Sequence, residues 1–183
     1  MDKKDFKIDF IGIGAKKCAT TWIYECLKEH PQICMSVPKE TNYFGFNYKK
    51  GLKWYESCFQ YCEIDQVKGE FSPAYIIDLE SVERIKKHNP SAKLIVSLRN
   101  PIERMYSIYL HNKDTGCCGF LSFSEFAKRS TGTNRSLIEM SLYYKYLKEF
   151  YSNFDKENIL ILIYEDIKKD PVGFIKKFMS SLK

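Results

Sequence analysis

Long hydrophobic runs are missing from this 183-residue sequence, and proline and glycine are scarce, with six and nine residues. No stretch approaches the roughly 18 consecutive apolar residues that a membrane-spanning helix needs. The apolar segment 6–14 is too short and too interrupted by charge for a signal peptide. The scarcity of proline and glycine leaves no low-complexity linker, and 44% apolar residues exclude a disordered chain. We therefore predict one domain, over residues 1–183, without a membrane span.

Histidine is also scarce, with three residues, and the seven cysteines form no C-x-x-C pair. Neither residue type has metal-ligand spacing, so no metal site is predicted. Cys58 and Cys62 are four residues apart, and the adjacent Cys117 and Cys118 are poorly placed for an ordinary bridge. We interpret most cysteines as small buried hydrophobes in a reducing compartment, which predicts a cytoplasmic protein. A Golgi lumenal domain without its anchor is the alternative.

The formal net charge is moderate, at +6 from 29 basic and 23 acidic residues. Such a charge favours an anionic ligand. The lysine pairs are scattered along the chain and do not form a basic stripe interleaved with aromatic residues. Solvated faces usually carry such pairs, so nucleic acid is not predicted as a partner.

Three β-rich segments are each followed by a helical pattern. The pairs are 7–13 with 21–30, 93–99 with a helix from Pro101, and 158–164 with a helix from Pro171. A further helix is expected over 78–87, and residues 122–154 have a helical pattern with Ser122 or Ser124, and Ser136, as candidate caps. Asn100 and Asp170 are suited to cap their helices because proline follows each of them. This alternation predicts an α/β fold with a parallel sheet.

The loop after the first of these strands has the composition of an anion-binding site. Gly14 ends the strand, a short basic loop contains Lys16 and Lys17, and Thr20 and Thr21 open the helix. The unpaired N–H groups of the first helical turn and the helix dipole point at this loop. Hydroxyl and ammonium groups complete a phosphate cradle. The alternative is a strand-to-helix turn with solvated lysines.

An ATP or GTP site is the obvious candidate for such a loop, but its register differs from the Walker pattern G-x-x-x-x-G-K-[ST]. Counted from Gly14, that pattern needs glycine at Ala19 and lysine at Thr20, whereas this lysine is Lys17. The strand 93–98 is followed by Arg99 and not by a carboxylate that would hold Mg²⁺. A P-loop nucleotide or small-molecule kinase is therefore disfavoured and stays as the alternative enzyme.

Residues 14–21 resemble the 5′-phosphosulfate loop of the sulfotransferases, G-x-x-K-x-G-T-T. Residues 93–107 resemble the 3′-phosphate motif of the same family, in which an arginine ends a strand and a serine follows eight residues later. Arg99 and Ser107 occupy those two positions. Residues 38–44 resemble the K-E-x-x-x-F segment of the carbohydrate branch, which includes heparan sulfate sulfotransferases and bacterial relatives.

The resemblance implies a P-loop-like three-layer α/β/α fold with a central parallel sheet. It also implies a metal-free sulfotransferase, which moves a sulfuryl group from 3′-phosphoadenosine 5′-phosphosulfate (PAPS) to a hydroxyl or amine of a carbohydrate or other small acceptor. The product would be adenosine 3′,5′-bisphosphate (PAP). Lys17 would stabilise the leaving phosphate, and Glu40, beside Lys39, would be the general base. The implied donor-binding residues are Gly14, Ala15, Lys16, Lys17, Cys18, Ala19, Thr20, Thr21, Trp22, Arg99 and Ser107.

The sequence departs from the family pattern at several places. Ala19 replaces the usual loop glycine, and Phe71 stands where heparan-type relatives often carry lysine. Tyr143 matches a tyrosine of many relatives and is interpreted as a packing residue or minor ligand contact. We also expect the chain, which stops at Lys183, to lack the segment that closes over the nucleotide in relatives. An inactive nucleotide-binding module is therefore a further hypothesis.

Overall fold

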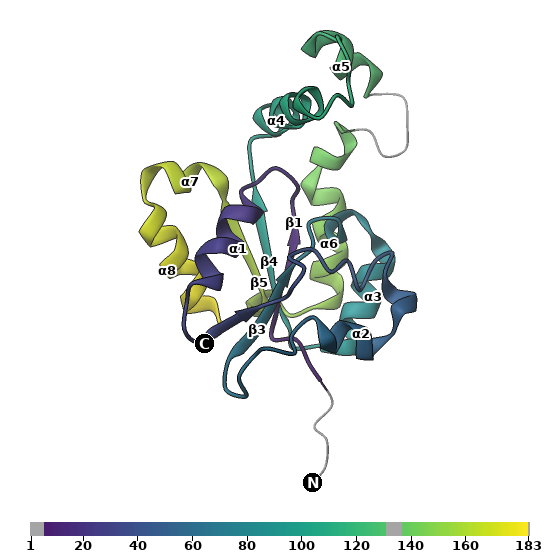
Figure 1. The fold of residues 1–183 in the computed structure, drawn as a ribbon. Coiled ribbons are helices and arrows are strands. Elements are labelled where there is room, and N and C mark those ends of the chain that lie inside the picture. Colours follow the sequence, from purple (N-terminus) through teal and green to yellow (C-terminus); the bar gives the residue numbers. More distant parts are fainter. Residues whose placement is uncertain (1–5, 131–136, 183) are drawn as a thin grey trace.

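The computed structural model describes residues 6–130 and 137–182. Within these residues a sheet of five parallel strands has the order β2-β3-β1-β4-β5 (Figure 1). The strands are β1 (Phe10–Gly14), β2 (Ile33–Met35), β3 (Val67–Phe71), β4 (Lys93–Leu98) and β5 (Ile159–Ile163). The α/β fold with a parallel sheet is confirmed.

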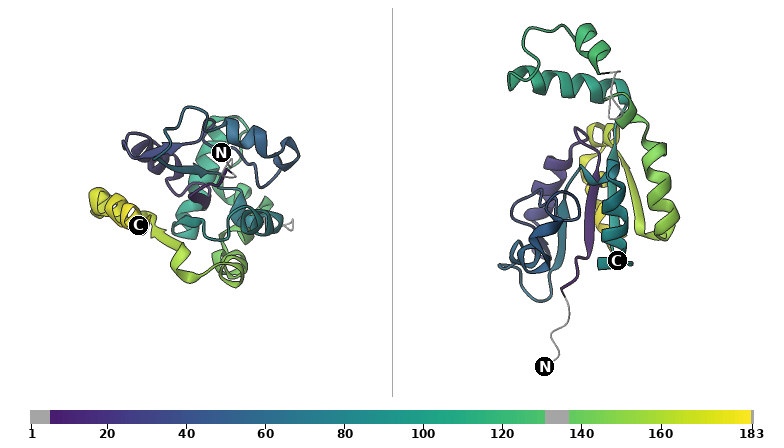
Figure 2. Two further views of the ribbon diagram at one scale, coloured as in Figure 1. Left: turned by 90° about the horizontal axis from the view of Figure 1, so that it is seen from below. Right: turned by 90° about the vertical axis from the view of Figure 1, so that its right-hand side faces the viewer.

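Helices cover both faces of the sheet, which confirms the three-layer arrangement (Figure 1). One face carries α1 (Thr20–Lys28), α7 (Tyr164–Lys169) and α8 (Pro171–Ser181). The other face carries α2 (Leu52–Ser57), α3 (Leu79–His88) and α6 (Tyr143–Asn153). In Figure 2, α4 (Pro101–Asp114) and α5 (Phe123–Arg129) project beyond the carboxyl ends of the strands. Short 3-10 turns occupy Tyr48–Lys50, Tyr75–Ile77, Glu139–Ser141 and Lys156–Asn158. Among the described residues, no helix is long and apolar enough to cross a membrane.

Alternate residues of β1, β4 and β5 supply two separate hydrophobic cores. Ile11 and Ile13 of β1 belong to the core beneath α3 and α6. Phe10 of the same strand belongs to the opposite core, beneath α1 and α8. Successive side chains of a strand point to opposite faces, so a sheet covered on both sides needs apolar residues at nearly every position. A third, smaller cluster joins α4 to α5.

The predicted helix starts after β4 and β5 are confirmed by their caps. The side chain of Asn100 accepts hydrogen bonds from the backbone N–H groups of Ile102 and Glu103, at 3.0 and 3.3 Å. Asp170 accepts one from the N–H of Gly173 at 2.8 Å. These contacts satisfy first-turn N–H groups that have no partner inside the helix.

Two parts of the predicted organisation change. Residues 122–154 form two separate helices, α5 and α6. Ser122 caps α5, and Ser136 lies outside the described residues.

The strands β2 and β3 were not predicted from the sequence. β2 is only three residues long, and β3 contains Lys68, Gly69 and Glu70 in place of an apolar run. Pairing with neighbouring strands forms these two strands, and a local pattern does not reveal such pairing.

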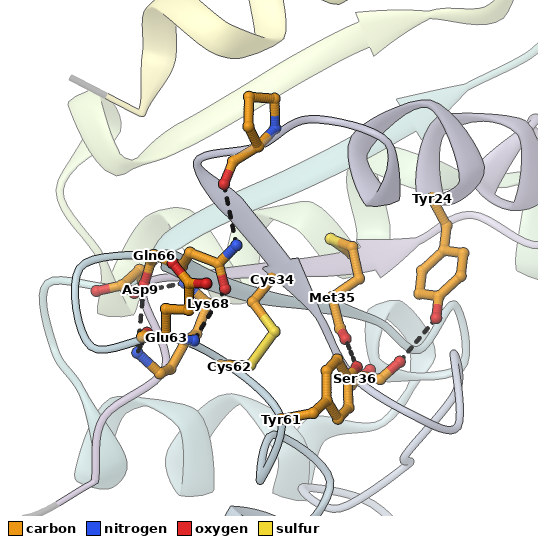
Figure 3. Close-up of a disulfide and its surroundings, with 11 residues drawn as sticks. Asp9, Tyr24, Cys34, Met35, Ser36, Tyr61, Cys62, Glu63, Gln66 and Lys68 are labelled. Carbon is orange, nitrogen blue, oxygen red and sulfur yellow. Dashed lines mark hydrogen bonds between the residues drawn. A yellow bond between two sulfur atoms is a disulfide. The ribbon is translucent and has the colours of Figure 1, made fainter.

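A disulfide between Cys34 and Cys62 corrects the reading of these two cysteines as free (Figure 3). Their Cα atoms are 5.6 Å apart although the two cysteines are 28 positions apart in the sequence. No local spacing of cysteines could therefore predict the bridge. The other five cysteines are free, and Cys18, Cys58 and Cys118 are buried as predicted. Disulfides persist in oxidising compartments. The bridge therefore removes part of the argument for a cytoplasmic location.

Candidate anion-binding site

Most of the predicted site residues come together in a cavity of about 450 Å³ at the carboxyl edge of the sheet. Open α/β sheets bind their ligands at this edge. The cavity is lined by Lys16, Lys17, Ala19, Thr20, Thr21, Glu40, Pro73, Arg99, Ser107, His111 and Tyr164. Eight of these lining residues were singled out from the sequence, and they come from three separate segments of the chain.

The loop between β1 and α1 has a backbone that favours ligand approach. Lys17 and Ala19 have positive φ angles, of 66° and 63°. Glycine adopts this left-handed conformation without steric cost, which explains why the family pattern has glycine where this chain has Ala19. The N–H of Ala15 donates to the carbonyl of Ser97 at 2.9 Å and ties the loop to β4. No side chain of residues 6–130 or 137–182 caps α1, so its first N–H groups are available to an anion.

Positive charge is concentrated on the cavity wall. Burial, together with the neighbouring charge of Lys16, lowers the pKa of Lys17, and the nearby Asp114 opposes this effect. Arg99 lines the same cavity, and its guanidinium lies over the ring of Tyr164, 4.2 Å from the centroid. Its Nη2 atom donates to Glu103 at 3.3 Å. A bound anion would relieve the repulsion between these cations.

Buried polar atoms without a partner gather at the same edge. Among the described residues, the buried side-chain atoms without a hydrogen-bond partner are Ser97 Oγ, Arg99 Nε, and Arg104 Nε and Nη1. All lie at the end of β4 or in the first turns of α4. Most buried polar groups in proteins are paired, so such a group calls for a specific explanation. Arg99 lines the cavity, so an anionic ligand there would supply the missing acceptor for its Nε atom.

Glu40 is an exposed carboxylate that also lines the cavity, in the segment that follows β2. Its Oε1 atom forms an ion pair with Nζ of Lys39 at 3.0 Å. The next residue, Thr41, is fully buried and donates to the buried Glu70. The backbone that carries Glu40 is thus anchored in the core while its side chain stays at the cavity.

Gly14, Ala15, Cys18 and Trp22 do not line this cavity. The side chains of the loop residues Ala15 and Cys18 are buried, and burial raises the pKa of the Cys18 thiol to about 11. The ring of Trp22 packs edge-on against Phe174, with centroids 6.0 Å apart. The ring of Trp22 therefore packs against α8, and its role in donor binding stays a prediction.

Three lining residues were missed in the sequence: Pro73, His111 and Tyr164. His111 lies one helical turn beyond Ser107, so helical periodicity could have found it. Tyr164 follows β5 directly, at the edge where β4 delivers Arg99. Pro73 follows β3, which carried no local strand signal.

Among the described residues no group of three or more His, Cys, Asp or Glu could hold a metal ion.

The sulfotransferase domain family matches residues 7–183. The chain belongs to this family. Mouse heparan sulfate glucosamine 3-O-sulfotransferase 3B1 is 31% identical to it over 175 residues, which cover 93% of the chain and 44% of that relative. Membrane-associated sulfotransferase kil1 of Dictyostelium discoideum is 39% identical over 104 residues, which cover 55% of the chain and 22% of that relative. The chain thus spans less than half the length of these relatives.

Solved structures of sulfotransferases share the fold of this sulfotransferase domain. An Alicyclobacillus acidocaldarius sulfotransferase aligns with a TM-score of 0.88 at 24% identity, covering 97% of this chain and 81% of that one. Mouse sulfotransferase SULT7A1, solved in complex with PAP, aligns with a TM-score of 0.63 at 16% identity, covering 97% of this chain and 60% of that one. These likenesses confirm the P-loop-like architecture that the resemblance implied.

Proposed function

We propose that residues 1–183 form a single sulfotransferase domain, which transfers a sulfuryl group from PAPS to a carbohydrate or another small hydroxyl or amine acceptor. One observation carries the proposal: Lys17, Arg99 and Glu40, from three separate motifs, line one cavity at the carboxyl edge of the sheet. Family membership and the named activity of the heparan sulfate relatives support it. The PAP complex of one structural neighbour supports the choice of donor.

The cavity offers suitable partners for both ends of such a donor. The hydroxyls of Thr20 and Thr21 and the N–H groups that open α1 would hold the 5′-phosphosulfate. Arg99 and Ser107 would hold the 3′-phosphate, which ATP lacks. The unpaired buried Nε atom of Arg99 fits this role, because a phosphate oxygen would complete its hydrogen bonding.

In the proposed reaction the acceptor oxygen or nitrogen attacks sulfur, while the bond between sulfur and the 5′-phosphate oxygen breaks. Glu40 takes the proton that the acceptor loses. The ammonium group of Lys17 lies against the leaving phosphate and neutralises the negative charge that develops there. Its lowered pKa reflects a partly desolvated position, where a charge interacts more strongly than in water.

The acceptor would lie on the side of Glu40. A second cavity, of about 500 Å³, is lined by Asn42, two residues after Glu40, and by Ala74, which follows Pro73. Phe46 and Tyr48 contribute aromatic surface to it, and the side chain of Phe46 is 76% exposed. Aromatic faces combined with a few polar groups suit a sugar ring. These features support a carbohydrate acceptor.

Calorimetric titration with PAP, 5′-AMP and Mg-ATP tests the donor assignment. We expect a clear preference for PAP without added metal, since only PAP has a 3′-phosphate for Arg99. A preference for Mg-ATP would replace this proposal with a P-loop kinase. Transfer is then measured with radiolabelled PAPS and N-sulfated heparosan oligosaccharides. Binding of PAP with no transfer to these or to a panel of other sugars and amines would favour an inactive nucleotide-binding module.

A further inference from the structure

Arg104 of α4 is a buried arginine inside the segment 93–107, where the 3′-phosphate motif gives roles only to Arg99 and Ser107. Its side chain is 1% exposed, and its Nε and Nη1 atoms have no hydrogen-bond partner in the described part of the chain. None of the ion pairs between described residues involves it. The ring of Tyr143 lies 5.9 Å from its guanidinium carbon. One cation–π contact at this distance offsets only a small part of the cost of burying the charge.

The position of Arg104 on its helix places it beside the cavity. Ser107 and His111 follow it by three and seven residues, and residues at this spacing share one helical face. Both line the cavity. The charges of Arg104 and Arg99 both act to lower the pKa of Cys18 in the phosphate loop, although burial of the thiol outweighs them. Arg104 itself does not line the cavity, but its charge acts on Cys18 of the loop whose Lys16, Lys17 and Ala19 do.

We propose that Arg104 is a further donor-binding residue, whose buried charge is complemented by the 3′-phosphate of the nucleotide. Arg99 approaches the phosphate from the end of β4, Ser107 from α4, and Arg104 from the helical turn between them. This inference rests on the proposed function, because the anion that it requires is the nucleotide donor. It adds a second cation to the 3′-phosphate site.

This role has an unusual consequence for stability. Replacing a buried ionic group with an apolar side chain of similar volume is often neutral or stabilising. Removing the charge of Arg104 should therefore leave the ligand-free domain as stable as before, or more stable, while it weakens nucleotide binding. An arginine that served only the fold would behave in the opposite way, because its removal would lower stability without selective loss of one nucleotide.

The experiment compares Arg104→Met and Arg104→Lys with the original chain. Arg129→Met is the matched control, because Arg129 is an exposed arginine of α5 outside the cavity and its loss changes the net charge equally. Affinities for PAP and 5′-AMP are measured by calorimetry. Melting temperatures are measured with and without PAP.

For Arg104→Met we expect an unchanged or higher melting temperature without ligand and about a tenfold or greater loss of PAP affinity. The loss for 5′-AMP should stay below about threefold, since that nucleotide lacks the 3′-phosphate. Arg104→Lys should keep most of the PAP affinity, and Arg129→Met should behave like the original chain.

Failure of Arg104→Met to fold would overturn the inference, as would equal losses for both nucleotides or PAP affinity within about threefold of the original. Failure of the proposed function is a separate result, because the original chain would then bind PAP no better than 5′-AMP.

Discussion

The hydroxyl of Thr41 donates a hydrogen bond of 2.5 Å to the carboxylate of Glu70, a side chain of β3 that is fully buried. Three more hydroxyls, from Ser72, Tyr55 and Tyr75, donate to the same carboxylate at 2.7, 2.8 and 3.1 Å. Thr41 follows Glu40, and Ser72 precedes Pro73. One buried carboxylate therefore ties two walls of the cavity to the sheet.

Glu70→Gln should loosen the wall that carries Glu40, because an amide has one acceptor oxygen for four hydroxyl donors. We expect a loss of about 1–3 kcal/mol in unfolding free energy. Hydrogen exchange should accelerate at the amides of Asn42 and Phe44, which donate to Ser72 and Tyr75 of this cluster. Mass spectrometry measures the exchange, with Glu83→Gln, an exposed change on α3, as the control. Unchanged protection at these amides would contradict the anchoring role.

Lys17→Ala should abolish sulfuryl transfer while the fold is retained, with a loss of about 100-fold or more in turnover. Lys16→Ala, on the same loop, should lower turnover much less. Since the pKa of Lys17 is lowered, its ammonium loses its proton at a lower pH than an ordinary lysine. Transfer should therefore decline at correspondingly lower pH on the alkaline side. The check is a pH–rate profile with radiolabelled PAPS, and near-normal turnover of Lys17→Ala would end its assignment.

Arg99→Ala should weaken the binding of PAP by about 2–4 kcal/mol if the pair of Arg99 and the 3′-phosphate is desolvated. The binding of 5′-AMP should weaken much less. The guanidinium would otherwise contact the 3′-phosphate that only PAP contains. Ile102→Ala, at an exposed position in the first turn of α4, is a suitable control. Calorimetry with both nucleotides decides the matter. Equal losses for the two would mean that Arg99 is not the 3′-phosphate ligand.

His88 should make the fold sensitive to mild acid. Burial, with the nearby charge of Lys7, lowers the pKa of His88 below 6.5, and its Nε2 atom accepts a hydrogen bond from the N–H of Ile8 at 3.3 Å. The unfolded chain binds the proton more readily, so stability is fully present above about pH 6.5 and declines as the pH falls below it.

Urea unfolding at pH 7.5 and 5.5 measures this decline. His88→Gln should reduce the difference between the two pH values, whereas His30→Gln should leave it unchanged. If His88→Gln showed the same decline as the original chain, another group would be responsible.

Removing the Cys34–Cys62 bridge should lower the unfolding free energy by about 3–4 kcal/mol, because the bridge closes a loop across 28 residues of sequence. The double change Cys34→Ala and Cys62→Ala should lower the melting temperature, with Cys26→Ala as the control at a free cysteine. Mass spectrometry of the unreduced protein checks the bridge directly. A pair of free thiols at these positions in the purified protein would disprove it.

Local patterns were sufficient for much of the fold and the candidate site. The loop 14–21 and the Asn100–Pro101 helix start could be read from adjacent residues, because caps and strand-to-helix turns depend on neighbours in sequence. The convergence of Lys17 and Arg99 also followed, since the carboxyl ends of parallel strands meet at one edge of the sheet.

The sequence by itself thus determined the class of fold, the family and most of the residues that line the cavity. Only the tertiary structure decided that β2 and β3 join the sheet, that Cys34 pairs with Cys62, and that Arg104 is buried with no ionic partner in the described part of the chain. The reason is physical. Each of these features depends on atoms contributed by segments far apart in the chain, whereas periodicity and capping act over a few neighbouring residues.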